Sequence, residues 1–144
     1  MSPPQGWDVR IARRQAEHPE ATSNPVLHAA SFPLPTERGD FGGFVTPLMS
    51  STDVFVVLFE YDREATGTAL FAQLGRPRPR PEHFNGRQLQ RTIPGQAGVQ
   101  YFFQENGRAF CLYIVLGAAS NRVSLASVVN DVLDTLEIDP AGAA

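Results

Sequence analysis

The sequence contains no lysine and only one cysteine. A single cysteine cannot form an internal disulfide, so we expect a fold that does not depend on an oxidising compartment. All twelve basic residues are arginines, which we take as the mark of a GC-rich bacterial genome. The formal net charge of -3 is mild and argues against a protein that binds nucleic acid by neutralising many phosphates.

Long hydrophobic runs are also absent. No apolar stretch approaches the roughly 20 residues that are needed to cross a bilayer. The first residues, MSPPQGWDVRIARR, lack the apolar core of a secretory signal. We therefore expect a soluble protein with a cytoplasmic location and no membrane partner.

The spacings that mark common catalytic and cofactor sites are missing. The chain has no GxxxxGK[ST], GxGxxG or GxSxG motif, and its three histidines are scattered without HExxH or CxxC spacing. Cys111 lies within an apolar run, where no neighbouring base would activate the thiol. We expect no cofactor, no metal and no catalytic residue. An enzyme would need a polar cluster around Glu60, His28 or His83 that only folding could assemble.

What is present suits one globular domain. A chain of 144 residues with 42% hydrophobic residues can bury a complete core without metal or disulfide support. We predict a single α+β domain over residues 1–139, with residues 140–144 as a disordered tail after Asp139-Pro140.

The strongest local pattern is a β-hairpin in VQYFFQENGRAFCLYIV. Asn106-Gly107 predicts a two-residue type I′ turn, because both central positions need a positive φ. That turn fixes the register of the two strands and places Cys111 opposite Phe102. The other face should belong to the core and carries the pairs Phe103–Phe110, Tyr101–Leu112 and Val99–Ile114.

Hydrophobic periodicity predicts the remaining elements. The run at 54–60 is apolar on both faces and indicates a central strand. Asp62 is a candidate N-cap for a helix over 62–74. Apolar residues from Leu125 to Leu136 recur at steps of three and four, which is typical of an amphipathic helix capped by Ser120 or Asn121. Further strands are expected at 7–12, 26–32 and, interrupted by Pro47, 44–49.

The order of these elements resembles the PsbP-like α/β/α sandwich. The residues that carry the resemblance are VFVVLFEYD at 54–62, the hairpin at 99–117 and SLASVVNDVLDTLEI at 124–138. The resemblance implies a mostly antiparallel sheet covered by helices, and a binding or adaptor module rather than a catalyst. We expect neither the leader nor the lipobox cysteine of the exported members, which argues against an extracytoplasmic role.

The chain also resembles an uncharacterised family of actinobacterial proteins. The shared phrases are ASFPLP, DVFVVLFEY and FCLYIVLG. This resemblance carries over no functional residue.

The segment RPRPRP at 76–81 is the most unusual stretch outside the hairpin. Alternating proline favours polyproline II, in which arginines two residues apart point in different directions around the axis. One interpretation is a stiff, solvated connector. The other is a docking strip for an acidic protein surface.

Because no catalytic constellation is evident, we predict a non-enzymatic protein-interaction or adaptor module. Its contact residues would be Arg78, Arg80 and Arg87. The alternative is a small-ligand-binding domain with an apolar pocket between sheet and helix.

Overall fold

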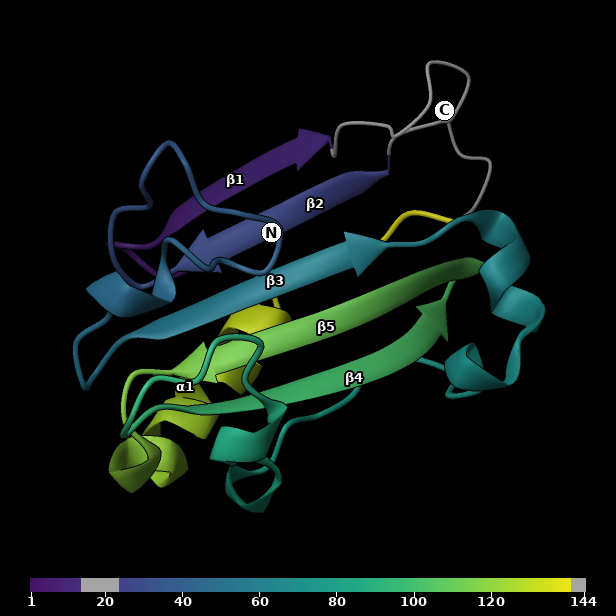
Figure 1. Cartoon of the computed structure of the whole chain (residues 1–144). Coiled ribbons are helices and arrows are strands. Elements are labelled where there is room, and N and C mark those ends of the chain that lie inside the picture. Colours follow the sequence, from purple (N-terminus) through teal and green to yellow (C-terminus); the bar gives the residue numbers. More distant parts are fainter. Residues whose placement is uncertain (14–23, 141–144) are drawn as a thin grey trace.

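The computed structural model describes residues 1–13 and 24–140. They form an open sheet of five antiparallel strands in the order β1-β2-β3-β5-β4 (Figure 1). The strands are β1 (Asp8–Arg13), β2 (Pro25–Ala30), β3 (Val54–Glu60), β4 (Ala97–Glu105) and β5 (Arg108–Leu116). Of the tail expected at 140–144, all but Pro140 lies outside the described residues.

The hairpin of β4 and β5 has the predicted register. Phe103 pairs with Phe110, Tyr101 with Leu112 and Val99 with Ile114. The turn residues Asn106 and Gly107 have φ values of 54° and 76°, so the type I′ prediction is confirmed. β3 occupies the centre of the sheet, where all its residues except the terminal Glu60 are buried.

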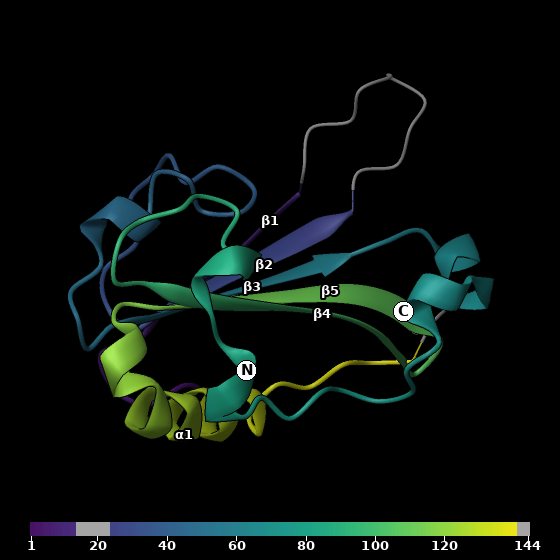
Figure 2. The same ribbon diagram turned by 60° about the horizontal axis from the view of Figure 1, so that its bottom comes forward.

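One α-helix, α1 (Arg122–Leu133), packs against the sheet (Figure 2). The predicted amphipathic pattern is confirmed, although the helix ends before Leu136. Asn121 occupies the N-cap position without capping the helix through its side chain. That side chain instead donates to the backbone oxygen of Ser51 at 2.9 Å. The buried residues of α1 are Leu125, Ala126, Val129, Val132 and Leu133.

The prediction of a helix over residues 62–74 is wrong. The segment forms two 3-10 helices, η2 (Arg63–Gly67) and η3 (Ala69–Phe71), separated by the extended residue Thr68. Of these two short helices only Phe71 is buried, so no apolar stripe holds a continuous helix against the sheet. Asp62 precedes η2 but makes no capping hydrogen bond.

The prediction of a strand over residues 44–49 is also wrong. The chain forms the 3-10 helix η1 (Thr46–Leu48) there, with Pro47 in its first turn. Proline is compatible with this position, because its fixed φ matches a helical turn and its missing N–H would be unpaired anyway.

The sheet has a core on each face. On one face, α1 covers side chains from β2 to β5, including Leu58, Leu112 and Ile114. The opposite face is covered by loops, and there Phe55, Phe59 and Tyr113 are buried. The fold is thus an α+β sheet with one helix on one side, where we expected two helices. No helix in residues 1–13 or 24–140 is long and apolar enough to span a bilayer.

Candidate functional site

The arginine and proline segment packs onto the domain. Pro77 and Pro79 are buried while Arg78 and Arg80 are exposed. The side chain of Asn130 in α1 donates a hydrogen bond to the backbone oxygen of Pro79 at 2.8 Å. The segment is therefore not a free connector, and both arginine side chains project into solvent instead of being spread around the axis of a free helix.

Two of the three predicted contact residues form exposed ion pairs. Arg78 lies 3.1 Å from Asp134, and Arg80 lies 3.8 Å from Glu82. Such pairs contribute at most about 1 kcal/mol to stability, so little energy opposes their exchange for another acidic group. Arg87 lies in the 3-10 helix η5 (Gly86–Gln88) and is exposed. We call Arg78, Arg80 and Arg87 the arginine strip.

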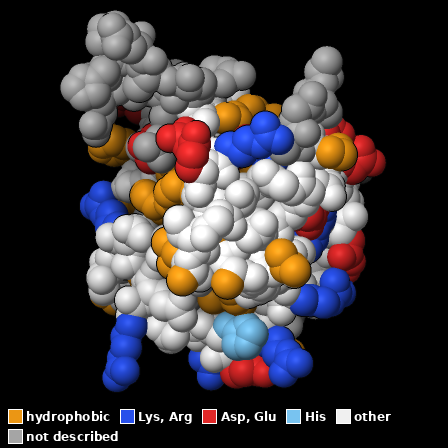
Figure 3. All heavy atoms as spheres, turned by 90° about the vertical axis from the view of Figure 1, so that its right-hand side faces the viewer, with side chains coloured by type: hydrophobic (Ala, Val, Ile, Leu, Met, Phe, Trp, Pro, Cys, Tyr) orange, Lys and Arg blue, Asp and Glu red, His pale blue; other side chains and the backbone are white. Residues whose placement is uncertain are grey.

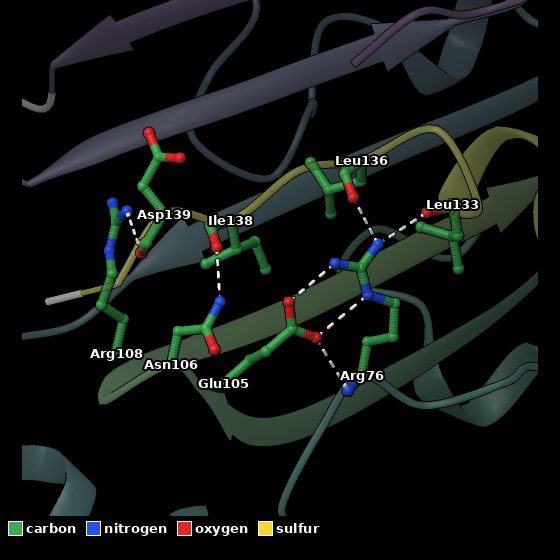
Figure 4. Close-up of polar contacts among 8 residues, drawn as sticks. All are labelled: Arg76, Glu105, Asn106, Arg108, Leu133, Leu136, Ile138 and Asp139. Atoms are coloured by element: carbon green, nitrogen blue, oxygen red, sulfur yellow. Dashed lines mark hydrogen bonds and ion pairs between the residues drawn. The ribbon is translucent and has the colours of Figure 1, made fainter. Parts of the chain in front are cut away.

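Arg76 fixes the start of this segment (Figure 4). Its guanidinium donates to both carboxylate oxygens of Glu105, at 3.0 and 2.7 Å. It also donates to the backbone oxygens of Leu133 and Leu136, at 2.8 and 2.6 Å. The hydrogen bonds from Arg76 lower the pKa of Glu105. Arg76 thus joins β4, the end of α1 and the chain beyond it.

Residues 134–139, which follow α1 and which we call the strap, run back along the sheet. Asn106 Nδ2 donates to the backbone oxygen of Ile138 at 2.6 Å, and Arg108 donates to that of Asp139 at 3.2 Å. Arg108 also forms a bidentate pair with Glu60, at 2.8 and 2.6 Å. The strap is therefore held by side chains from the hairpin.

A groove of about 120 Å³ lies between the strap and strands β1, β2, β3 and β5. Its lining is mostly apolar, with charged groups supplied by Glu60, Arg108 and Glu137. We call it the strap groove. Figure 3 shows one end of the molecule, where hydrophobic, acidic and basic side chains are exposed near one another in the upper part of the described surface. The apolar residues that line the groove are Ile11, Pro25, Leu27, Leu58, Phe110, Leu136 and Ile138.

The groups that we named as an alternative polar cluster have separate partners. Glu60 pairs with Arg108 on the face covered by α1. His28 is buried on the other face, where its ring is tilted by 49° against that of Phe55 at a centroid distance of 5.5 Å. The third group, His83, lies 2.7 Å from the hydroxyl of Tyr101. The structure therefore does not bring them together, and His18 lies outside the described residues.

Cys111 is fully buried opposite Phe102. Gln100 Nε2 lies 3.2 Å from its sulfur. Burial raises the pKa of the thiol to about 11, and the hydrogen bond from Gln100 opposes this only in part. The cysteine is thus placed as a packed side chain, as the sequence predicted.

The sequence did not predict the ion pairs beside the strap, although Glu60 was named as a candidate for a polar cluster. Glu105 and Arg108 are opposite each other in the hairpin register, which suggests a cross-strand pair. In the structure each carboxylate or guanidinium turns to a residue far along the chain: Glu105 to Arg76, and Arg108 to Glu60. The only signal available was the charge of these residues beside a two-residue turn.

No protein-family model matches the chain, and neither a curated protein nor a solved structure matches it. The functional proposals therefore rest on the geometry of the arginine strip and the strap groove.

Proposed function

We propose that the protein is a non-enzymatic interaction or adaptor module that docks on an acidic protein surface through Arg78, Arg80 and Arg87. One observation carries the proposal: in the 77–80 segment the prolines are buried and the arginines are exposed. The side chains of Arg78 and Arg80 are 69% and 71% exposed. Charged groups are thus displayed from a backbone that the fold already holds.

A fixed backbone favours binding, because less conformational entropy is lost when the partner docks. The segment is anchored on either side of Arg78. Before it, Arg76 donates to Glu105, and after it, the backbone oxygen of Pro79 accepts a hydrogen bond from Asn130 in α1. Guanidinium groups suit the role, since each can form two parallel hydrogen bonds with a carboxylate. The arginines therefore offer directional contacts to aspartate or glutamate side chains.

The proposal includes a PsbP-like architecture, membership in the actinobacterial family named above and a cytoplasmic location. The antiparallel sheet, the long hairpin and the C-terminal helix support the architecture. The same elements support an adaptor role by resemblance alone. A cytoplasmic location is consistent with a free, buried cysteine.

A second candidate function is binding of a small ligand in the strap groove. The groove lies between the sheet and the chain after α1, close to where an apolar pocket was expected. Its volume of about 120 Å³ is well below the roughly 300–1,000 Å³ of typical ligand pockets. The groove therefore favours a protein side chain over a metabolite.

The test compares two variants that remove the same charge. One carries Arg78→Gln, Arg80→Gln and Arg87→Gln. The control replaces three other exposed arginines, Arg10, Arg63 and Arg122, by glutamine. Each protein is used as bait in lysate of the native host, and captured proteins are quantified by mass spectrometry.

We expect a partner that the wild type and the control variant retain and the arginine-strip variant loses. Equal recovery of every partner by all three baits would contradict the proposal.

A further inference from the structure

We infer that the strap groove is a second binding site, which takes one bulky apolar side chain flanked by arginine or lysine from a protein partner. The site uses different residues from the arginine strip, so it goes beyond the function proposed above. The two proposals share only the idea that the partner is a protein.

The size of the groove indicates a single side chain. A dry cavity of about 150 Å³ lined by aliphatic and aromatic groups is large enough for benzene. The strap groove, at about 120 Å³, is slightly smaller and is lined by Leu27, Leu58 and Phe110 among others. Leucine, isoleucine or phenylalanine would fill it, whereas a typical metabolite would not fit.

One wall of the groove is an exposed apolar residue. Ile11 in the edge strand β1 keeps 69% of its surface accessible, while Leu136 and Ile138 in the strap are buried. A side chain that entered the groove would therefore cover Ile11 and contact the buried residues that line the groove at the same time. Removal of both apolar surfaces from water favours binding.

The charges around the groove select the flanking residues. The guanidinium of Arg108 is already bound by Glu60 at 2.6 Å. Glu137 lines the groove, and Asp139 follows it in the strap. Both are exposed and form no ion pair within residues 1–13 and 24–140. Glu137 thus offers an exposed carboxylate at the lining of the groove to a basic group next to the inserted side chain, and Asp139 adds a second negative charge two residues further along the strap.

The groove is built before any partner arrives. The strap that forms its wall is held by hydrogen bonds from Asn106 to Ile138 and from Arg108 to Asp139. Arg76 holds the strap at Leu136. A preformed wall lowers the entropic cost of binding.

The experiment uses the full chain, labelled with ¹⁵N, and a blocked seven-residue peptide with phenylalanine between two arginines. Matched peptides replace the phenylalanine by alanine or both arginines by glutamate. We expect the first peptide to shift the amide signals of Leu27, Leu58 and Ile138. The alanine peptide should not bind, and the glutamate peptide should bind about fivefold more weakly or worse.

Two variants test the charge. Glu137→Arg should weaken binding of the arginine peptide several-fold. Asp131→Arg makes the same change on an exposed residue of α1 that does not line the groove, and should leave binding unchanged. The variant with Arg78, Arg80 and Arg87 replaced by glutamine should also bind normally, so failure of the arginine strip would not affect this test.

Three results would overturn the inference. They are no shift at millimolar peptide, equal binding of the glutamate peptide, and shifts at the groove with toluene but not with the peptide. The last result would show a site for a small apolar ligand.

Discussion

At the scale of the residue, burial determines the reactivity of the Cys111 thiol. The side chain is fully buried, and the pKa of its thiol is raised to about 11. Both effects oppose reaction, because the thiolate is the reactive species and needs access to the reagent. We expect no labelling of Cys111 by an aromatic disulfide reagent in the folded protein at neutral pH, and complete labelling in denaturant. Rapid labelling under native conditions would show that the residue is accessible and activated.

His28 is a second buried residue whose chemistry is set by its neighbours. Arg38 Nε donates to Nδ1 at 2.9 Å, so this nitrogen is an acceptor. Nε2 lies 2.9 Å from the backbone oxygen of Asp40 and donates to it. Burial lowers the pKa of His28, the nearby charge of Arg38 lowers it further, and the contacts with Asp40 oppose the shift in part. The ring is therefore neutral in the folded protein at pH 7.

This lowered pKa predicts a dependence of stability on pH. Below about pH 6.5 the unfolded chain binds a proton at His28, whereas the folded chain does not, so stability falls as the pH decreases from 6.5. The variant His28→Gln should show a smaller loss between pH 7.5 and pH 5.5 in urea unfolding. Glu105, whose pKa is lowered by Arg76, acts at lower pH. An identical loss in wild type and variant would contradict the assignment.

At the scale of the element, Arg76 is one of three side chains that hold the strap, together with Asn106 and Arg108 of the hairpin. Arg76 joins Glu105 to the backbone oxygens of Leu133 and Leu136. Replacing Arg76 by glutamine should lower the free energy of unfolding by about 2 to 3 kcal/mol, because hydrogen bonds to charged groups are lost and Glu105 is left half-buried. Urea denaturation measures the change.

The matched control is Arg78→Gln, two residues further along. Its pair with Asp134 is exposed, so this substitution should cost no more than about 1 kcal/mol. Equal losses for both variants would show that Arg76 does not hold the strap.

Elements with a local cause were predictable from the sequence. The hairpin follows from Asn106-Gly107, since the turn alone sets the register. The prediction of a helix over 62–74 was wrong because local spacing alone does not bury an apolar face. Its apolar spacing was real, but Leu70 and Leu74 remain 58% and 80% exposed. A periodic pattern forms a lasting helix only where its apolar face is buried.

The strap groove was not predictable, because its contacts join distant parts of the chain. The partners of Arg76 lie 29, 57 and 60 residues away in sequence. The pair of Arg108 with Glu60 spans 48 residues. Arg78 and Arg80 were named from the RPRPRP pattern, but the exposure of their side chains depends on the burial of Pro77 and Pro79, which the pattern does not reveal. In the structure Asn130 of α1 donates to the backbone oxygen of Pro79.

At the scale of the whole molecule, the sheet holds a core on both of its faces, and Leu112 lies in the middle of one. It is 1% exposed and pairs with Tyr101 and Leu58 on its two sides. Leu112→Asp should unfold the domain. The free energy of unfolding of a typical domain is roughly 5–15 kcal/mol, and the substitution both buries an unpaired charge and removes the packing of Leu112. Circular dichroism and thermal melting measure this.

Leu74→Asp is the matched control, because Leu74 is 80% exposed. It should melt cooperatively near the wild-type temperature. A Leu112→Asp variant that also melts cooperatively would contradict the position of Leu112 in the core.

Function belongs to the same scale, because the arginine strip works only as part of the folded surface. The most direct measurement introduces a photo-crosslinking amino acid at Glu82, which lies beside Arg80 at 3.8 Å and leaves all three arginines in place. Glu64, an exposed glutamate in η2, is the matched position. We predict a crosslinked partner protein at position 82 that is absent at position 64 and is lost when Arg78, Arg80 and Arg87 are replaced by glutamine. No crosslinked protein at position 82, or one that survives replacement of the arginines, would contradict the account.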